Sequence, residues 1–298
     1  LHIAIYTFHV PLLAALSGVF ARRARRGLVR DVTDLLIPYL VFQILYSVAD
    51  LLAGGRETLH ISLLTPTFLT WYLLSLFAWR WLARLVEGLP LALPLVFLVG
   101  IGAGYLEPLD YRLSLSRTVV FFPFFLIGAR LPRDAFTEMT TKWFRIAGGL
   151  FLALLLAEIV WWDPQFDLHW LYGGIPYSGI STGAPWIGGV VRAGFYALAC
   201  VAGAAFLSLV PRGRRFFTVW GARSLGAYLL HGLLVEVAIG FGVYELDLSQ
   251  PWRQAALVAA AVAVAMVLSS RPAFATARAL GGQSWLGRWV AVRFGGGV

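Results

Sequence analysis

The sequence predicts an all-α fold, a polytopic transmembrane helical bundle, and two observations support this prediction. Hydrophobic residues make up 59% of the 298 residues and charged residues only 13%, whereas a soluble domain is nearer half apolar and a quarter charged. The apolar residues also gather into segments of the ~20 residues that a helix needs to cross a bilayer. Because no polar stretch between these segments is long enough to fold alone, the sequence predicts no separate soluble domain.

Nine apolar segments are candidates for spanning helices; the fourth is interrupted by Pro and Gly, and the fifth is short. They cover residues 2–20, 32–53, 67–86, 89–106, 116–130, 145–162, 187–210, 217–241 and 252–270. The remaining residues, 271–298, place arginines among Trp and Leu, which is typical of a short amphipathic helix on the membrane surface or of a disordered tail. We therefore expect a membrane domain over residues 1–270 and a basic cytoplasmic tail over residues 271–298.

The connectors between these segments alternate in charge. Five arginines follow the first segment between residues 22 and 30, whereas the connector 163–186 contains no Lys or Arg. Loops rich in Lys and Arg stay in the cytoplasm, so the first segment runs from outside to inside. We expect one more spanning helix upstream of residue 1, which gives ten helices with both ends cytoplasmic. A nine-helix protein with a translocated N-terminus is the alternative.

The same rule explains the formal net charge of +9. Surplus Lys and Arg are expected in cytoplasmic loops, so this charge points to the membrane bilayer as the partner and not to nucleic acid. The single cysteine, Cys200, can form no internal disulfide and no metal cluster. Phosphate-binding loops, dinucleotide fingerprints and zinc-protease motifs are absent from the sequence. We therefore expect neither a metal nor a nucleophile of the kind found in soluble hydrolases.

His9 lies inside the first apolar segment, two residues before Pro11. Charged or ionisable residues inside a bilayer cost on the order of 2.5–3.5 kcal/mol on insertion scales and face a partner or water. Pro11 cannot donate a backbone hydrogen bond, which leaves a carbonyl available near Thr7. Two interpretations are open: a polar pocket built around the imidazole, or a kinked packing helix whose histidine bonds a neighbouring carbonyl.

Other costly residues occur in later segments. Ser224, Tyr228 and His231 are spaced i, i+4 and i+7, so they share one helical face; they can form a site or simply bond to neighbouring helices. Arg117 begins the fifth segment, where the helix dipole does not favour a cation, and this position indicates an anionic partner. Arg192 and Glu158 lie near the outer ends of adjacent segments and can pair with each other. The outer connector 161–186 is rich in Trp and Tyr, typical of an interfacial aromatic belt or of a platform for a sugar.

Five motifs, in this order along the chain, resemble the membrane acyltransferase 3 family, and most closely its fucose 4-O-acetylase-like branch. They are Phe8-His9-Val10-Pro11-Leu12 with Leu16-Ser17-Gly18, Leu36-Ile37-Pro38-Tyr39, Trp71-Tyr72-Leu73, Arg117 with Phe121 to Gly128, and Gly221 to Leu225 with Leu230-His231. The sequence departs from the family pattern at Val10, where Met is usual, and at Asp31 and Asp34, where the family tends to be basic. The family's catalytic histidine lies in a first helix that this sequence does not include.

The resemblance implies an integral-membrane acyltransferase with about ten spanning helices in the cytoplasmic (plasma) membrane. Such a protein moves an acyl group, usually acetyl, from cytoplasmic acetyl-CoA to a hydroxyl of an extracytoplasmic glycan or lipid-linked sugar, without a metal. On this basis His9 and His231 are expected to transfer protons, Arg117 to hold an anionic group, and Arg26 and Arg30 to face the phosphates of the donor. The expected substrate-binding residues are Trp71, Tyr72, Ser17, Ser224, Tyr228 and Trp170.

Two other functions are compatible with the same residues. A transporter or flippase for a lipid-linked sugar would bind its substrate with them and perform no chemistry. Such transporters often contain repeated halves with interrupted helices in matching positions, and the sequence has no such symmetry. The other alternative is a catalytically inactive, truncated member of the family.

Overall fold

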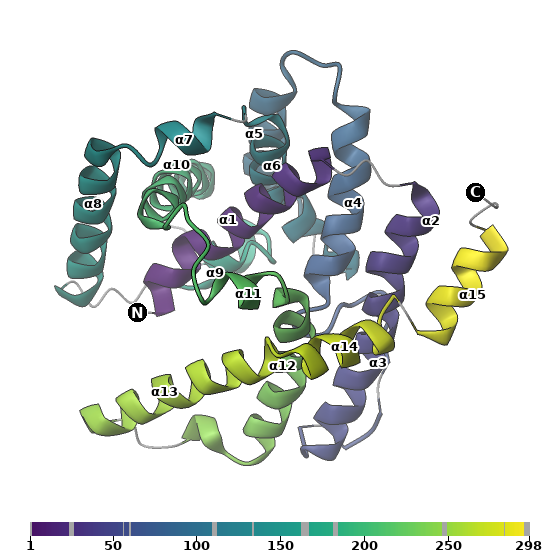
Figure 1. Cartoon of the computed structure of the whole chain (residues 1–298). Helices are drawn as coiled ribbons and strands as arrows, with labels where there is room; N and C mark the ends of the chain where they lie inside the picture. The colour runs from purple at the N-terminus through teal and green to yellow at the C-terminus, as the bar shows by residue number, and fades with distance from the viewer. Residues whose placement is uncertain are drawn as a thin grey trace. The chain divides into compact units, whose positions relative to one another are not determined.

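The computed structural model describes residues 2–23, 27–55, 57–59, 61–108, 112–132, 134–161, 167–180, 184–245, 249–282 and 284–294. Over these residues the secondary structure is helical and contains no strand, as predicted (Figure 1). Contacts divide the chain into two compact units. Unit 1 consists of Leu1–Arg25 and Ala78–Arg212, and unit 2 of Arg26–Phe77 and Gly213–Val298.

The helices of unit 1 are α1 (His2–Arg23), the C-terminal part of α4 (Trp71–Leu85), α5 (Ala92–Gly102), α6 (Leu115–Arg130), α7 (Ala135–Glu138), α8 (Lys142–Trp161), α9 (His169–Tyr172) and α10 (Pro185–Leu209). Those of unit 2 are α2 (Leu28–Asp31), α3 (Ile37–Leu52), the start of α4, α11 (Thr218–Gly221), α12 (Ser224–Gly240), α13 (Pro251–Leu268), α14 (Arg271–Leu280) and α15 (Trp285–Phe294).

Each of the nine predicted apolar segments contains a helix. Among the described residues, five helical stretches are long and apolar enough to cross a membrane: Ile3–Arg22, Leu28–Leu52, Arg112–Arg130, Pro185–Leu209 and Pro251–Leu268. Ala92–Tyr105 and Ser224–Gly240 are shorter apolar helices, and the other two segments form α4 and α8, which also carry charged residues. The chain is therefore a multi-pass helical membrane protein.

In unit 1, α1 packs on α6 through two glycines. A Cβ atom added to Gly18 would overlap the carbonyl oxygen of Phe125, and one added to Gly128 would overlap that of Ala15. Small residues let helix backbones approach closely, which is how helices associate when both their surfaces and the surrounding lipid are apolar. This contact fixes α1, which carries His9, against α6, which carries Arg117.

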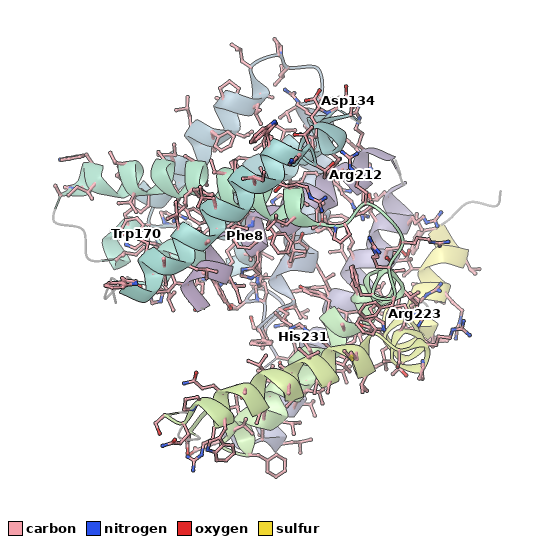
Figure 2. The ribbon with its side chains drawn as sticks, turned by 60° about the vertical axis from the view of Figure 1, so that its left-hand side comes forward. Phe8, Asp134, Trp170, Arg212, Arg223 and His231 are labelled. Atoms are coloured by element: carbon pink, nitrogen blue, oxygen red, sulfur yellow. The ribbon has the colours of Figure 1, made fainter. Side chains whose placement is uncertain are left out.

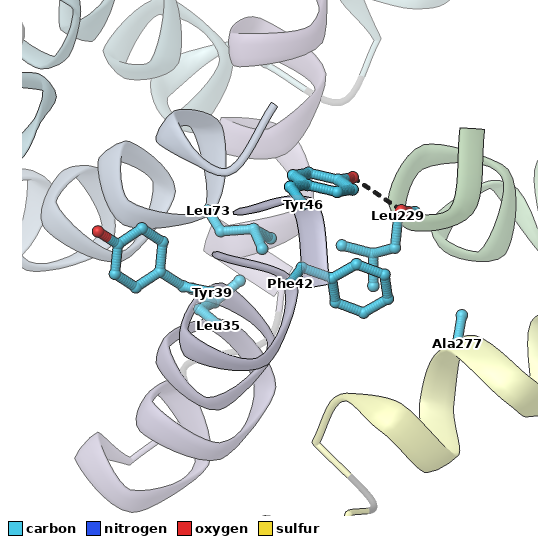
Figure 3. Close-up of a cluster of buried hydrophobic side chains, with 7 residues drawn as sticks. All are labelled: Leu35, Tyr39, Phe42, Tyr46, Leu73, Leu229 and Ala277. Atoms are coloured by element: carbon cyan, nitrogen blue, oxygen red, sulfur yellow. Dashed lines mark hydrogen bonds between the residues drawn. The ribbon is translucent and has the colours of Figure 1, made fainter. Parts of the chain in front are cut away.

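In unit 2, the core forms where α3, α12, α14 and the start of α4 meet (Figure 3). The phenol of Tyr46 donates to the carbonyl of Leu229 at 2.7 Å, so its polar tip is satisfied inside the apolar cluster. The buried residues of this cluster are Leu35, Tyr39, Phe42, Tyr46, Leu73, Leu229 and Ala277.

Ala277 belongs to the predicted tail, so the first part of that tail is built into the core of unit 2. Ser270 caps the start of α14, because its hydroxyl accepts a hydrogen bond from the backbone N–H of Ala273 at 3.4 Å. Pro272 follows in the first turn, a position that suits proline. Of the two sequence interpretations of residues 271–298, the described part supports helix and not disorder; the domain boundary at residue 270 stays a prediction.

Candidate functional site

The imidazole of His9 is held by its own helix. Its Nδ1 lies 3.0 Å from the carbonyl oxygen of Ile5, one turn earlier in α1. Because a carbonyl can only accept, Nδ1 carries the hydrogen of this bond, and Nε2 is the nitrogen that can take a proton. The partner is Ile5 and not the carbonyl of Thr7 that Pro11 was expected to release. The bond expected for a packing histidine is therefore present, and it also fixes the tautomer that a base requires.

Aromatic rings connect His9 with the connector that follows α8. The ring of Tyr6 packs edge-on against His9 at 4.5 Å between centroids and against Tyr172 of α9 at 5.2 Å. The ring of Tyr172 lies 6.1 Å from that of His169. The imidazole in α1 and the imidazole of the connector thus belong to one group of rings in unit 1, which we name the His9 group: Tyr6, His9, His169 and Tyr172.

His169 is paired with a carboxylate. Its Nδ1 lies 2.6 Å from Oδ1 of Asp167, and its backbone N–H donates to the same oxygen at 2.9 Å. These hydrogen bonds hold the pKa of Asp167 below its ordinary value. Both side chains remain open to solvent, with 49% of His169 and 41% of Asp167 exposed, so the pair can reach a molecule outside the protein.

Buried donors hold α9 in place. Arg192 of α10, only 1% exposed, donates from a terminal guanidinium nitrogen to the carbonyl of Trp170 at 2.9 Å. Ser116 donates to the carbonyl of Gly173 at 2.8 Å. Gly173 ends α9 with φ +58°, a left-handed conformation that favours glycine. The segment bearing His169 and Tyr172 is thus anchored through its backbone to α6 and α10.

Arg192 has a different partner from the one that the sequence suggested. Glu158, its expected partner, is exposed on α8, while the guanidinium of Arg192 is buried near the rings of Tyr177 and Phe195, at 5.8 and 5.9 Å from their centroids. Burial raises the pKa of the Tyr177 phenol, and the charge of Arg192 opposes this shift. The sequence shows only that Arg192 is a cation near the end of an apolar segment. Its hydrogen bond to the carbonyl of Trp170 depends on the fold.

Predicted site residues also meet in unit 2. The ring of Tyr72 lies 5.6 Å from that of Trp71 and 6.1 Å from that of Tyr228, which in turn lies 6.2 Å from His231. The phenol of Tyr228 donates to the carbonyl of Leu69. Nδ1 of His231 lies 2.8 Å from the carbonyl of Ala227, the same arrangement as in His9. Trp71, Tyr72, Tyr228 and His231 therefore form the His231 group.

The other predicted site residues lie on different helices, and Trp170 of α9 is labelled in Figure 2. Trp170 is 8% exposed and packs against Tyr177, so its ring offers little area to an acceptor. Ser17 is half-buried on α1, eight residues after His9, and Ser224 is exposed at the start of α12. Arg117, half-buried in the first turn of α6, follows Ser116 and so lies beside the end of α9.

On the donor side, Arg30 is exposed in unit 2 and lies 3.9 Å from Asp34, while Arg26 is outside the described residues. Unit 1 has a different basic feature. The C-terminal ends of α1, α4 and α6 surround a pocket of about 320 Å³, which we name the arginine pocket. Its charged lining residues are Arg22, Arg80, Arg84, Arg130 and Glu87. Across the described part of the chain, no three His, Cys, Asp or Glu side chains could hold a metal ion.

Fold and site together define a multi-pass membrane protein with ordered imidazoles on apolar helices and a basic pocket at helix ends. A family model described as an acyltransferase domain matches residues 1–270. The chain therefore belongs to the acyltransferase 3 family and is a membrane acyltransferase. The match is to the family as a whole, and the fucose 4-O-acetylase-like branch stays a prediction. No curated protein and no solved structure matches the chain.

Proposed function

We propose that the protein transfers an acyl group, in the first place acetyl, from cytoplasmic acyl-CoA to a hydroxyl of an extracytoplasmic glycan or lipid-linked sugar. The plasma membrane, with its cytoplasmic donor and external acceptor, is the setting that this reaction needs. The observation that carries the proposal is the arrangement of His9. Its Nδ1 is tied to Ile5, its ring belongs to the same group as His169, and the connector bearing His169 contains no Lys or Arg.

His9 suits the role of general base. Nε2 would take the proton from the acceptor hydroxyl while the hydroxyl oxygen forms a bond to the acyl carbon. The bond between that carbon and the thioester sulfur then breaks, and the CoA thiolate leaves with the proton that the imidazolium returns. Arg117, in the first turn of α6, would stabilise negative charge that develops on the acyl oxygen. His231, held in the same tautomer in unit 2, is the second proton-transfer residue of the proposal.

Each ring group, taken by itself within its own unit, carries side chains that suit a sugar acceptor. Asp167 and His169 supply a carboxylate oxygen and an imidazole nitrogen, which bind hydroxyl groups. Trp71, Tyr72 and Tyr228 supply ring faces near His231, and Ser17 and Ser224 supply hydroxyls. No cation accompanies the Asp167–His169 pair among the described residues of segment 167–180. This composition favours a neutral sugar over a phosphorylated one as the group bound there.

The test uses the full chain in proteoliposomes with acetyl-labelled acetyl-CoA on the cytoplasmic side and a cell-envelope glycan fraction on the other. Wild type should transfer label to the glycan. His9→Gln should lower the rate about 10²- to 10⁴-fold, the usual contribution of a general base. Glu158→Gln, which changes an exposed carboxylate on α8, is the matched control and should behave like wild type.

Three results would reject the proposal. Wild type and His9→Gln transferring label equally would remove His9 from the chemistry. Movement of a lipid-linked sugar across the membrane with no label transferred would support the transporter interpretation. Absence of both activities in a folded, reconstituted protein would favour an inactive member of the family.

A further inference from the structure

The arginine pocket gathers positive charge from three separate parts of the chain. Arg22 comes from α1, Arg80 and Arg84 from α4, and Arg130 from α6, with Glu87 as the acidic lining residue. Four arginines and one glutamate leave a formal charge of +3 around a space of about 320 Å³. All three helices contribute their C-terminal ends, which is the end that the charge pattern of the connectors places in the cytoplasm.

Several of these arginines are fixed by the fold. Arg22 donates to the carbonyl of Leu131 at 3.0 Å, and Arg130 donates to those of Val86 and Leu89 at 3.0 and 2.9 Å. The guanidinium of Arg84 stacks over the ring of Trp81 at 4.2 Å. A guanidinium has five N–H donors in a rigid fork, so one nitrogen bonded to a carbonyl still leaves donors that can bind an anion.

A simpler account is that these arginines only complement the helix ends. Cations are favourable near C-terminal carbonyls, and the bonds of Arg22 and Arg130 to carbonyls agree with that account. It gives no reason for a pocket, however. The lining residues Ala21, Ala83 and Ala129 are small, so the space between the guanidinium groups stays open, and Phe125 and Leu126 supply an apolar wall.

The distance to His9 identifies the ligand that fits. His9 and Arg22 lie on one continuous helix, α1. Thirteen residues at 1.5 Å per residue separate them by about 20 Å along the axis. An extended pantetheine arm of coenzyme A can bridge such a distance between its phosphates and its thioester. A free phosphate bound in the pocket would have no part near His9, and a phospholipid would place only acyl chains there, with no thioester to react.

We propose that the arginine pocket binds the phosphate groups of the acyl-CoA donor, so that the pantetheine arm extends along α1 and brings the thioester to His9. This inference rests on the proposed function for the identity of the donor. It moves the donor contact from Arg26 and Arg30, expected from the sequence, to Arg22, Arg80, Arg84 and Arg130. Phosphate esters bind guanidinium groups through paired N–H···O bonds, which is why arginine is the residue found here.

The experiment compares two donors with the same thioester. Initial rates are measured in proteoliposomes with acetyl-CoA and with S-acetylpantetheine, which has no phosphate. Wild type should prefer acetyl-CoA. In Arg80→Gln and in Arg84→Gln, the KM for acetyl-CoA should rise about tenfold or more, equivalent to ~1.4 kcal/mol or more. The KM for S-acetylpantetheine and kcat should stay near wild type, so the preference between donors shrinks.

Arg214→Gln is the matched control, because Arg214 is an exposed arginine of the basic connector before α12 in unit 2 and does not line the pocket. It should leave both KM values unchanged. Competition by 3′,5′-ADP, which carries phosphates but no thioester, tests the pocket without a second donor. It should inhibit wild type and inhibit Arg84→Gln about tenfold more weakly.

Three outcomes would overturn the inference. One is an unchanged donor preference in both arginine variants. Another is a wild type that uses S-acetylpantetheine as well as acetyl-CoA. The third outcome concerns phosphatidylglycerol in the vesicles. If this lipid stimulates wild type but neither arginine variant, and the KM for acetyl-CoA is unchanged in both variants, the pocket binds a lipid phosphate. Calorimetry with free CoA tests the pocket without any acyl transfer. A failure of the proposed function can therefore be distinguished from a failure of the pocket to bind CoA.

Discussion

The packing of α1 on α6 gives a sharp prediction for Gly128→Ala. A Cβ atom at Gly128 would lie 2.6 Å from the carbonyl carbon of Ala15 and 2.9 Å from its Cα, whereas carbon atoms pack at about 3.5–4.0 Å. The obstacle is backbone, so the two helices must separate. Overpacking costs about 1–3 kcal/mol, and contact with backbone places this case at the upper end. The higher helix propensity of Ala relative to Gly offsets about 1 kcal/mol of this cost.

The remaining loss of about 2 kcal/mol corresponds to a melting temperature roughly 4–8 °C lower, at 2–4 °C per kcal/mol for a domain of 150–250 residues. This melting temperature is measured by thermal unfolding in detergent, with tryptophan fluorescence as the signal. Gly194→Ala is the control: Gly194 also lies in an apolar helix, α10, but a Cβ there meets nothing within 4 Å. That variant should melt at or above the wild-type temperature. Equal melting of the two variants would refute the close α1–α6 contact.

Two further predictions concern the polar contacts of each unit. Gln43→Leu should destabilise unit 2 by about 3 kcal/mol and open segment 61–70 to limited proteolysis. The side chain of Gln43 makes five hydrogen bonds to that segment, and each buried group left unsatisfied costs about 1–3 kcal/mol. An unchanged cleavage pattern would contradict this prediction. The bonds from His169 lower the pKa of Asp167, so the folded state binds this proton more weakly than the unfolded state. Their contribution is complete above the unfolded pKa of about 4 and disappears as pH falls through the folded value. The melting temperatures of wild type and Asp167→Asn should therefore differ at pH 6 and converge as pH falls below the folded pKa of Asp167, and a constant difference would show that the carboxylate charge has no part in it.

The sequence predicted the features that depend on local pattern. Apolar length located a helix in each of the nine predicted segments, and the i, i+4, i+7 spacing of Ser224, Tyr228 and His231 placed them on α12, where Tyr228 and His231 do lie together. The histidine bonds to Ile5 and Ala227 are also local, because each joins residues one turn apart. Helical periodicity and hydropathy are sufficient to foresee features of this kind.

Features formed between distant residues could not be foreseen in the same way. Nothing near Arg192 in the sequence indicates the carbonyl of Trp170 as its partner, and the exposed Glu158 was the nearer choice. Tyr6 and Tyr172 are both ordinary aromatic residues of a membrane protein until α9 is placed against α1. The arginines of α4 and α6 similarly read as topology signals, and they form a pocket only because three helix ends meet.

The sequence by itself determined that this protein is a helical membrane protein, where its apolar helices lie, and, through five ordered motifs, the acyltransferase 3 family that the comparison then showed. The tertiary structure alone decided which residues form the His9 group, the His231 group and the arginine pocket. The physical reason is that apolar helix faces are equally well solvated by lipid, so hydrophobicity does not choose their partners. Close steric fit selects the partner of each helix, as Gly18 and Gly128 do between α1 and α6.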